Sequence, residues 1–84
     1  MRLPSNLDLA ATRALLSALR EARGQAIAID AAGVERFGAP SLQLLLSAKA
    51  TWAEDVQDFQ IQAPSPAFVA AAALMGFDHN LDVA

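Results

Sequence analysis

The sequence contains no cysteine and only one histidine. Without cysteine the chain cannot form a disulfide framework, a reactive thiolate or a cysteine-based metal site, and a single histidine excludes a histidine-rich metal site. Its four glycines, at positions 24, 33, 38 and 76, lie too far apart for a phosphate-binding loop or a dinucleotide-binding fingerprint. The sequence therefore predicts no metal and no cofactor.

Basic residues and long apolar runs are also scarce. Six Lys and Arg stand against nine Asp and Glu, for a net charge of −3, and no basic stripe is present, which argues against nucleic-acid binding. The longest apolar stretch, Ala67 to Met75, is well short of the ~20 residues of a membrane helix. Met1-Arg2 is not followed by the apolar run of a signal peptide. We therefore expect a soluble cytoplasmic protein with no direct membrane insertion.

The chain is nevertheless rich in hydrophobic residues. They make up 55% of its 84 residues and give a mean hydropathy of +0.32, which argues against disorder. This length is enough for one domain, so we expect a single domain over residues 1–84. Because a small domain leaves some apolar side chains outside, an exposed apolar patch would indicate a partner surface.

Apolar spacing and helix-end signals predict three helices. The first begins after a cluster of capping candidates, Ser5, Asn6 and Asp8, and ends at Gly24; the second runs from Pro40 to about Ala53; the third starts at Ser65-Pro66 and stops at Gly76. In the second helix, the expected buried positions are Leu42, Leu45, Leu46 and Trp52, with Leu44 outside.

Two strands alternate with these helices. Residues 26–30 form the first, with Ile27 and Ile29 on one face and two alanines small enough to lie under a helix on the other. Residues 58–62 alternate apolar and polar and form the second. Because a helix separates the two strands, we expect them to pair in parallel through a right-handed crossover, as in an α/β fold. Residues 77–83 are expected to add a last short strand.

The residues that could carry chemistry are few. The acidic residues are spread along the chain in a pattern typical of solvated surface charge, with Asp30 the exception because it ends the central strand beside a loop. Ser41 falls in the first turn of the second helix, where free N–H groups and the helix dipole favour a phosphate. The alternative is that Ser41 only helps to cap this helix. A small enzyme using Asp30, Ser41 or His79 is the weakest hypothesis, since no nucleophile-elbow pattern is present.

The stretch from Ile27 to Leu46 resembles the STAS domain, shared by sulfate transporters and anti-sigma factor antagonists. In that family a strand ends in Asp, and a short loop leads to Asp-Ser-Ser-Gly-Leu at the start of an apolar helix. Here the strand ends in Asp30, and Gly38-Ala39-Pro40-Ser41-Leu42 takes the place of that motif. Ala39 and Pro40 stand at the phosphorylatable positions, so the motif is degenerate, and Ser41 at the glycine position is the remaining phosphorylation candidate.

The resemblance implies a small α/β fold. Its mixed sheet, with mostly parallel central strands, would pack with about three helices. The N-terminal strand would be truncated, because only Met1 to Leu3 stand where family members have a strand or hairpin. A self-pairing sheet edge would favour a homodimer.

The resemblance also implies a non-enzymatic regulatory module without catalytic residues. It would dock an anti-sigma factor, a serine kinase or another, for example chemotaxis-like, signalling protein through the 30–41 loop and the start of the second helix. The implied partner-binding residues are Asp30, Glu35, Arg36, Gly38, Ala39, Pro40, Ser41 and Leu44. The alternative is a constitutive structural subunit of a transport or signalling complex, which Ala39 and Pro40 favour because they cannot carry a phosphoswitch.

Overall fold

The computed structural model describes residues 1–74 and 76, which form three helices and four short strands. The elements, in chain order, are β1 (Asn6–Leu7), α1 (Leu9–Ala22), β2 (Ile27–Asp30), β3 (Arg36–Phe37), α2 (Ala39–Glu54), β4 (Phe59–Gln62) and α3 (Pro66–Leu74). This order confirms the predicted helices and both predicted strands. The strand expected over residues 77–83 lies outside the described residues, and β1 and β3 were not predicted.

Polar caps and glycine set the ends of α1. Of the three capping candidates, Asp8 is the N-cap, and its carboxylate accepts a hydrogen bond from the Ala11 N–H at 2.8 Å. Past the last turn, Gly24 has a φ of +90°, a conformation that glycine adopts without steric cost. Both ends therefore lie where local chemistry predicts them.

Parallel pairing organises the strands. β2 pairs with β4 in parallel, from Ile27 opposite Phe59 to Asp30 opposite Gln62. On the other side of β2, the N–H of Leu3 donates to the Asp30 oxygen at 2.9 Å. Residues 1–3 thus lie along the edge of β2 opposite β4. β1 and β3 form a separate parallel pair, and all strand pairings among the described residues are parallel.

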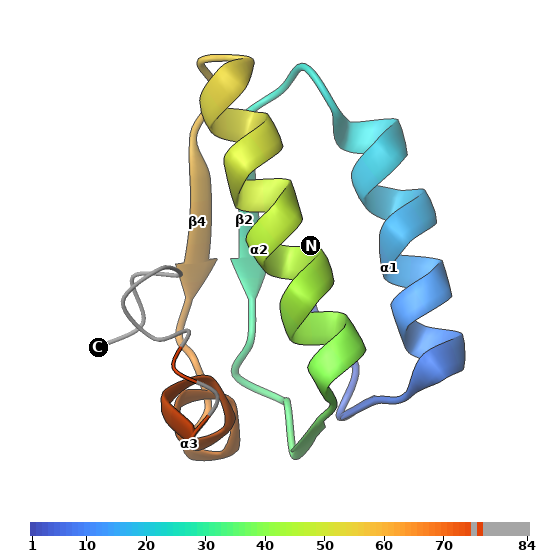
Figure 1. The fold of residues 1–84 in the computed structure, drawn as a ribbon, viewed down its shortest axis with the longest axis vertical. Coiled ribbons are helices and arrows are strands. Elements are labelled where there is room, and N and C mark those ends of the chain that lie inside the picture. Colours follow the sequence, from blue (N-terminus) through green and yellow to red (C-terminus); the bar gives the residue numbers. More distant parts are fainter. Residues whose placement is uncertain (75, 77–84) are drawn as a thin grey trace.

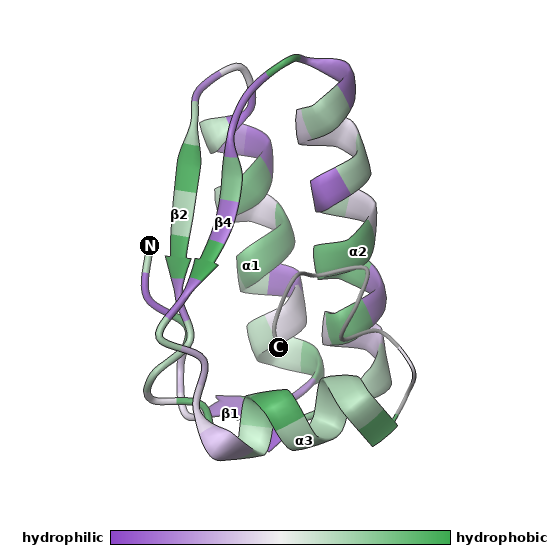
Figure 2. Cartoon of the chain, turned by 90° about the vertical axis from the view of Figure 1, so that its left-hand side faces the viewer, coloured by the Kyte–Doolittle hydropathy of each residue, from purple (hydrophilic) through white to green (hydrophobic). Residues whose placement is uncertain are grey.

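Both long helices cover the same face of the β2–β4 sheet. Figures 1 and 2 show α1 and α2 side by side on this face, with α3 lying across one end. Ile29 is completely buried beneath them, whereas Ala26 and Ala28 are exposed. The expectation that these alanines lie under a helix is therefore wrong, because both helices pack on the isoleucine face.

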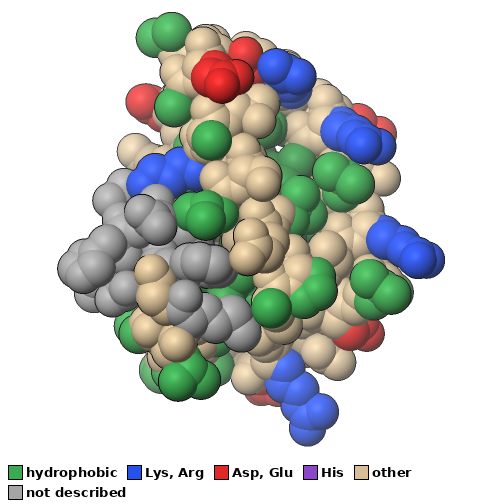
Figure 3. Space-filling model, viewed as in Figure 1, with side chains coloured by type: hydrophobic (Ala, Val, Ile, Leu, Met, Phe, Trp, Pro, Cys, Tyr) green, Lys and Arg blue, Asp and Glu red, His purple; other side chains and the backbone are tan. Residues whose placement is uncertain are grey.

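The core lies between the helices and the sheet. Leu42, Leu45 and Phe68 are fully buried, and Trp52 is 3% exposed, while Leu46 and Leu44 are both half-buried. The indole N–H of Trp52 donates to the backbone oxygen of Gln25 at 2.7 Å, which satisfies its polar group inside the core. On the outer side of the helices, Figure 3 shows hydrophobic side chains in the hollow between α1 and α2.

Candidate partner-docking surface

The loop between β2 and β3 has a fixed backbone. The carboxylate of Asp30 accepts a hydrogen bond from the Ala32 N–H at 2.9 Å, which closes a tight turn directly after the strand. At the other end of the loop, the backbone oxygen of Ser5 accepts from the N–H groups of both Glu35, at 2.7 Å, and Arg36, at 2.9 Å. The loop is therefore held at both ends, although its side chains reach solvent.

The start of α3 fastens the same loop from inside. The hydroxyl of Ser65 donates to the backbone oxygen of Val34 at 2.5 Å and accepts from the N–H of Phe68 at 3.1 Å. Ser65 thus caps α3, as predicted, and also ties this helix to the loop. The rings of Phe37 and Phe68, with centroids 4.5 Å apart, add an apolar contact between β3 and α3.

Helix α2 begins without a side-chain cap. Its N-cap is Gly38, and no side chain hydrogen-bonds at this cap. Pro40 occupies the first turn, where its missing N–H costs nothing. Ala39 and Pro40 are both exposed, so the start of the helix presents a small apolar surface.

Ser41 lies in the same turn but points inward. It has no exposed surface, and its hydroxyl lies 2.5 Å from the Thr12 hydroxyl and 3.4 Å from the backbone oxygen of Leu7. The Thr12 hydroxyl also donates to the Asp8 oxygen at 2.8 Å. These hydrogen bonds of Ser41 connect α2 to α1 and β1 rather than capping α2. A phosphate on this oxygen requires the contact between the two helices to open.

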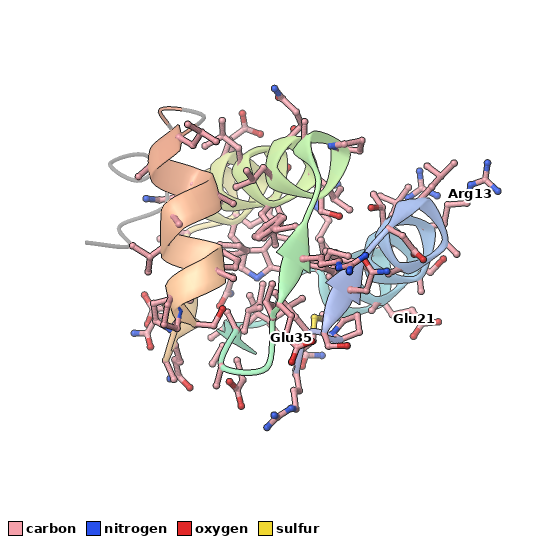
Figure 4. All side chains as sticks on the ribbon, turned by 90° about the horizontal axis from the view of Figure 1, so that it is seen from below. Arg13, Glu21 and Glu35 are labelled. Atoms are coloured by element: carbon pink, nitrogen blue, oxygen red, sulfur yellow. The ribbon has the colours of Figure 1, made fainter. Side chains whose placement is uncertain are left out.

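The residues predicted to bind a partner fall into three groups by exposure. Glu35, Arg36, Ala39 and Pro40 are exposed; Asp30, Gly38 and Leu44 are half-buried; and Ser41 is buried. In the view from below, β3 runs between the loop that carries Glu35 and the start of α2 (Figure 4). One end of the molecule therefore presents the exposed group, and we call these four exposed residues the loop surface.

A comparison with protein-family models identifies the chain. The family described as "Mlab, STAS domain" matches residues 1–83. The chain belongs to the STAS domain family. STAS domains are generally non-catalytic and typically bind proteins, and the family includes anti-sigma factor antagonists. Searches of curated proteins and of solved structures gave no significant match.

Two of the three residues of the enzyme hypothesis, Asp30 and Ser41, already have polar partners within this STAS domain. Asp30 accepts from Ala32 and forms an ion pair with Arg2 at 3.5 Å, and the Ser41 hydroxyl is buried in hydrogen bonds. His79, the third residue of the enzyme hypothesis, lies outside the described residues. Within residues 1–74 and 76, no group of three or more His, Cys, Asp or Glu side chains could hold a metal ion. In the same residues, no helix is both long and apolar enough to cross a membrane.

Two features of the STAS domain escaped the sequence interpretation. Thr12, the partner of Ser41, is an ordinary residue of the first helix, and nothing in its neighbourhood marks it. The second feature is the row of basic side chains on α1. The sequence does contain a signal for this row, because Arg13 and Arg20 are seven residues apart and so share one face of the helix.

Proposed function

We propose that this STAS domain is a non-enzymatic regulatory module that docks a signalling protein through the loop surface. The observation that supports this proposal is the combination of exposed side chains with a backbone held by Ser5 and Ser65. A preformed surface loses little conformational entropy when it binds. The partner classes are an anti-sigma factor, a serine kinase or a chemotaxis-like signalling protein.

The chemistry of the loop surface suits a protein partner. Glu35 and Arg36 place one negative and one positive side chain beside the apolar pair Ala39 and Pro40. Opposite charges around a small apolar centre give orientation as well as contact area. Asp30, Gly38 and Leu44 extend this surface with their half-exposed atoms.

The alternative function is a constitutive subunit of a transport or signalling complex. The burial of Ser41 favours it, as do Ala39 and Pro40 at the family's phosphorylatable positions. In the regulatory version, Ser41 is phosphorylated only when α1 and α2 separate at their N-terminal ends, and the new charge then keeps them apart.

Reversing the charge of Glu35 tests the loop surface. We expect Glu35→Lys to weaken capture of the partner from a native lysate, quantified by mass spectrometry, by about tenfold. Glu21→Lys is the matched control, because Glu21 is an exposed glutamate in the last turn of α1, and Figure 1 shows that end of α1 and the loop after β2 at opposite ends of the molecule. If Glu35→Lys binds the same partner as tightly as Glu21→Lys does, the loop surface is not the docking site.

Intact-mass measurement distinguishes a regulatory module that is phosphorylated on Ser41 from a constitutive subunit. The captured partner and the domain are incubated with and without ATP, and the complex is then re-isolated. A phosphate on Ser41 together with release of the partner supports the regulatory version. An unmodified domain that stays bound in both conditions supports the constitutive subunit.

A further inference from the structure

A second surface lies between α1 and α2, on the side of the helices that faces away from the sheet (Figure 3). It is a groove of about 180 Å³ whose apolar lining includes Leu16, Leu19, Leu44, Ala48 and Trp52. We call it the interhelical groove. A groove of this size admits individual side chains rather than a whole helix, so a bound segment must lie over it and insert anchors.

A stripe of apolar and basic residues on α1 borders this groove, and three of its members, Leu16, Arg20 and Arg23, line it. Leu9, Arg13, Leu16, Arg20 and Arg23 follow each other at intervals of three or four residues, which places them on one face of the helix. Leu9 is 60% exposed although it is a large apolar residue. Figure 3 shows the basic side chains as a row along the α1 side of the hydrophobic hollow.

The three arginines of this stripe differ in whether they have a partner within the domain. The Arg23 guanidinium lies 3.1 Å from the Asp55 carboxylate, and this hydrogen bond raises the pKa of Arg23, which ties the end of α1 to the end of α2. The guanidinium groups of Arg13 and Arg20 have no hydrogen-bond or ion-pair partner in the part of the chain that the structure describes. The α2 side of the groove is uncharged, with Leu44, Ser47 and Thr51.

We propose that the interhelical groove docks an acidic amphipathic helix of a protein partner. Apolar side chains of that helix enter between Leu16 and Leu44, and carboxylates along one of its edges meet Arg13 and Arg20. Because only the α1 side is charged, the pairing also fixes the direction in which the helix lies. An anionic membrane fits less well, because the groove admits individual inserted side chains, whereas a lipid surface is broad and flat.

This groove is a different surface from the loop surface, so the proposal does not depend on the proposed function. The two surfaces meet only near Leu44, and substitutions at Arg13, Arg20 or Glu35 affect one without the other.

Two synthetic helical peptides test the proposal on the full chain. Both carry leucines on one face; one has glutamates along the adjacent edge and the other has lysines there. Trp52 is the only tryptophan and lines the groove, so its fluorescence reports binding directly. Backbone amide NMR then locates the peptide. We expect the glutamate peptide to shift Trp52 emission and the amides of α1 and α2 that face the groove, and the lysine peptide to bind much more weakly.

Charge reversal supplies the decisive comparison. The double variant Arg13→Glu/Arg20→Glu is expected to bind the glutamate peptide about tenfold more weakly and to gain affinity for the lysine peptide. Gln60→Glu/Gln62→Glu is the control, because both glutamines are exposed but lie on β4, away from the groove, and the effect of this double variant should be below about twofold. The same loss in both variants, or amide shifts confined to other elements, overturns the proposal. So does binding of the chain to phosphatidylglycerol-containing vesicles that depends on Arg13 and Arg20, because the occupant is then a membrane.

Discussion

The starts of α2 and α3 carry the same two residue types in opposite order, and their serines have different roles. In α3, Ser65 precedes Pro66, caps the helix and ties it to the loop at Val34. In α2, Ser41 follows Pro40 and binds Thr12 on α1, leaving Gly38 as a cap without a side chain. The comparison teaches that a serine near a helix start acts by its position in the turn. Ser65 immediately precedes its helix, whereas Ser41 is the third residue of α2, and this displacement within the first turn turns a cap into a contact between helices.

Placing a charge on Ser41 should have the largest effect. Ser41→Asp puts a carboxylate at a site with no exposed surface, next to the backbone oxygen of Leu7. We expect a loss of about 3–5 kcal/mol in the free energy of unfolding, because the charge is buried without a partner. Urea titration followed by Trp52 fluorescence measures this loss. An unfolding midpoint equal to that of the parent chain would show that Ser41 reaches solvent.

Removing the Ser65 hydroxyl should have an intermediate effect. Ser65→Ala eliminates the cap of α3 and leaves the buried oxygen of Val34 without its donor, and we expect a loss of about 2 kcal/mol. Ser41→Ala should cost only about 1 kcal/mol, since the Thr12 hydroxyl still donates to Asp8. The exposed Ser17→Ala is the control and should change stability by less than about 0.5 kcal/mol. The reverse ranking of Ser65→Ala and Ser41→Ala would contradict the two assigned roles.

Supplying the missing cap of α2 should have the smallest effect, and in the opposite direction. A Cβ atom at Gly38 would meet its nearest neighbours at 3.6 and 3.7 Å, which is ordinary contact, and the φ of −91° suits any residue. Gly38→Asn is expected to stabilise the domain by a few tenths of a kcal/mol, roughly the difference between these two caps. Gly38→Ala has the same Cβ without the cap and should be slightly destabilising. Thermal unfolding of both variants checks the sign.

The helices and longer strands were predictable because their signals are local. Asp8, Gly24 and the Ser65-Pro66 pair mark ends through hydrogen bonds and dihedral angles within a few residues. The two-residue strands β1 and β3 exist only because Leu7 lies opposite Phe37, a pairing of segments far apart in the sequence. No local pattern encodes such a pairing.

The exposure of most candidate site residues was predictable from the sequence, but the direction in which Ser41 points was not. The exposure of Glu35, Arg36 and Pro40 agrees with a loop leading into a helix. The burial of Ser41 depends on how α2 is rotated against α1, which the position of Ser41 in the first turn does not determine. The interhelical groove also depends on how α1 and α2 pack against each other, so the sequence alone does not predict it.

The central place of β2 has a consequence for the order of folding. One neighbour of β2 is residues 1–3 and the other is β4, so both of its pairings join segments that are distant along the chain. The turns of α1 and α2 need only sequence neighbours, and loop closure must precede strand pairing. Refolding should therefore form helical signal first and complete the sheet last. Trp52, bonded to Gln25 just before β2, is placed to report that final step.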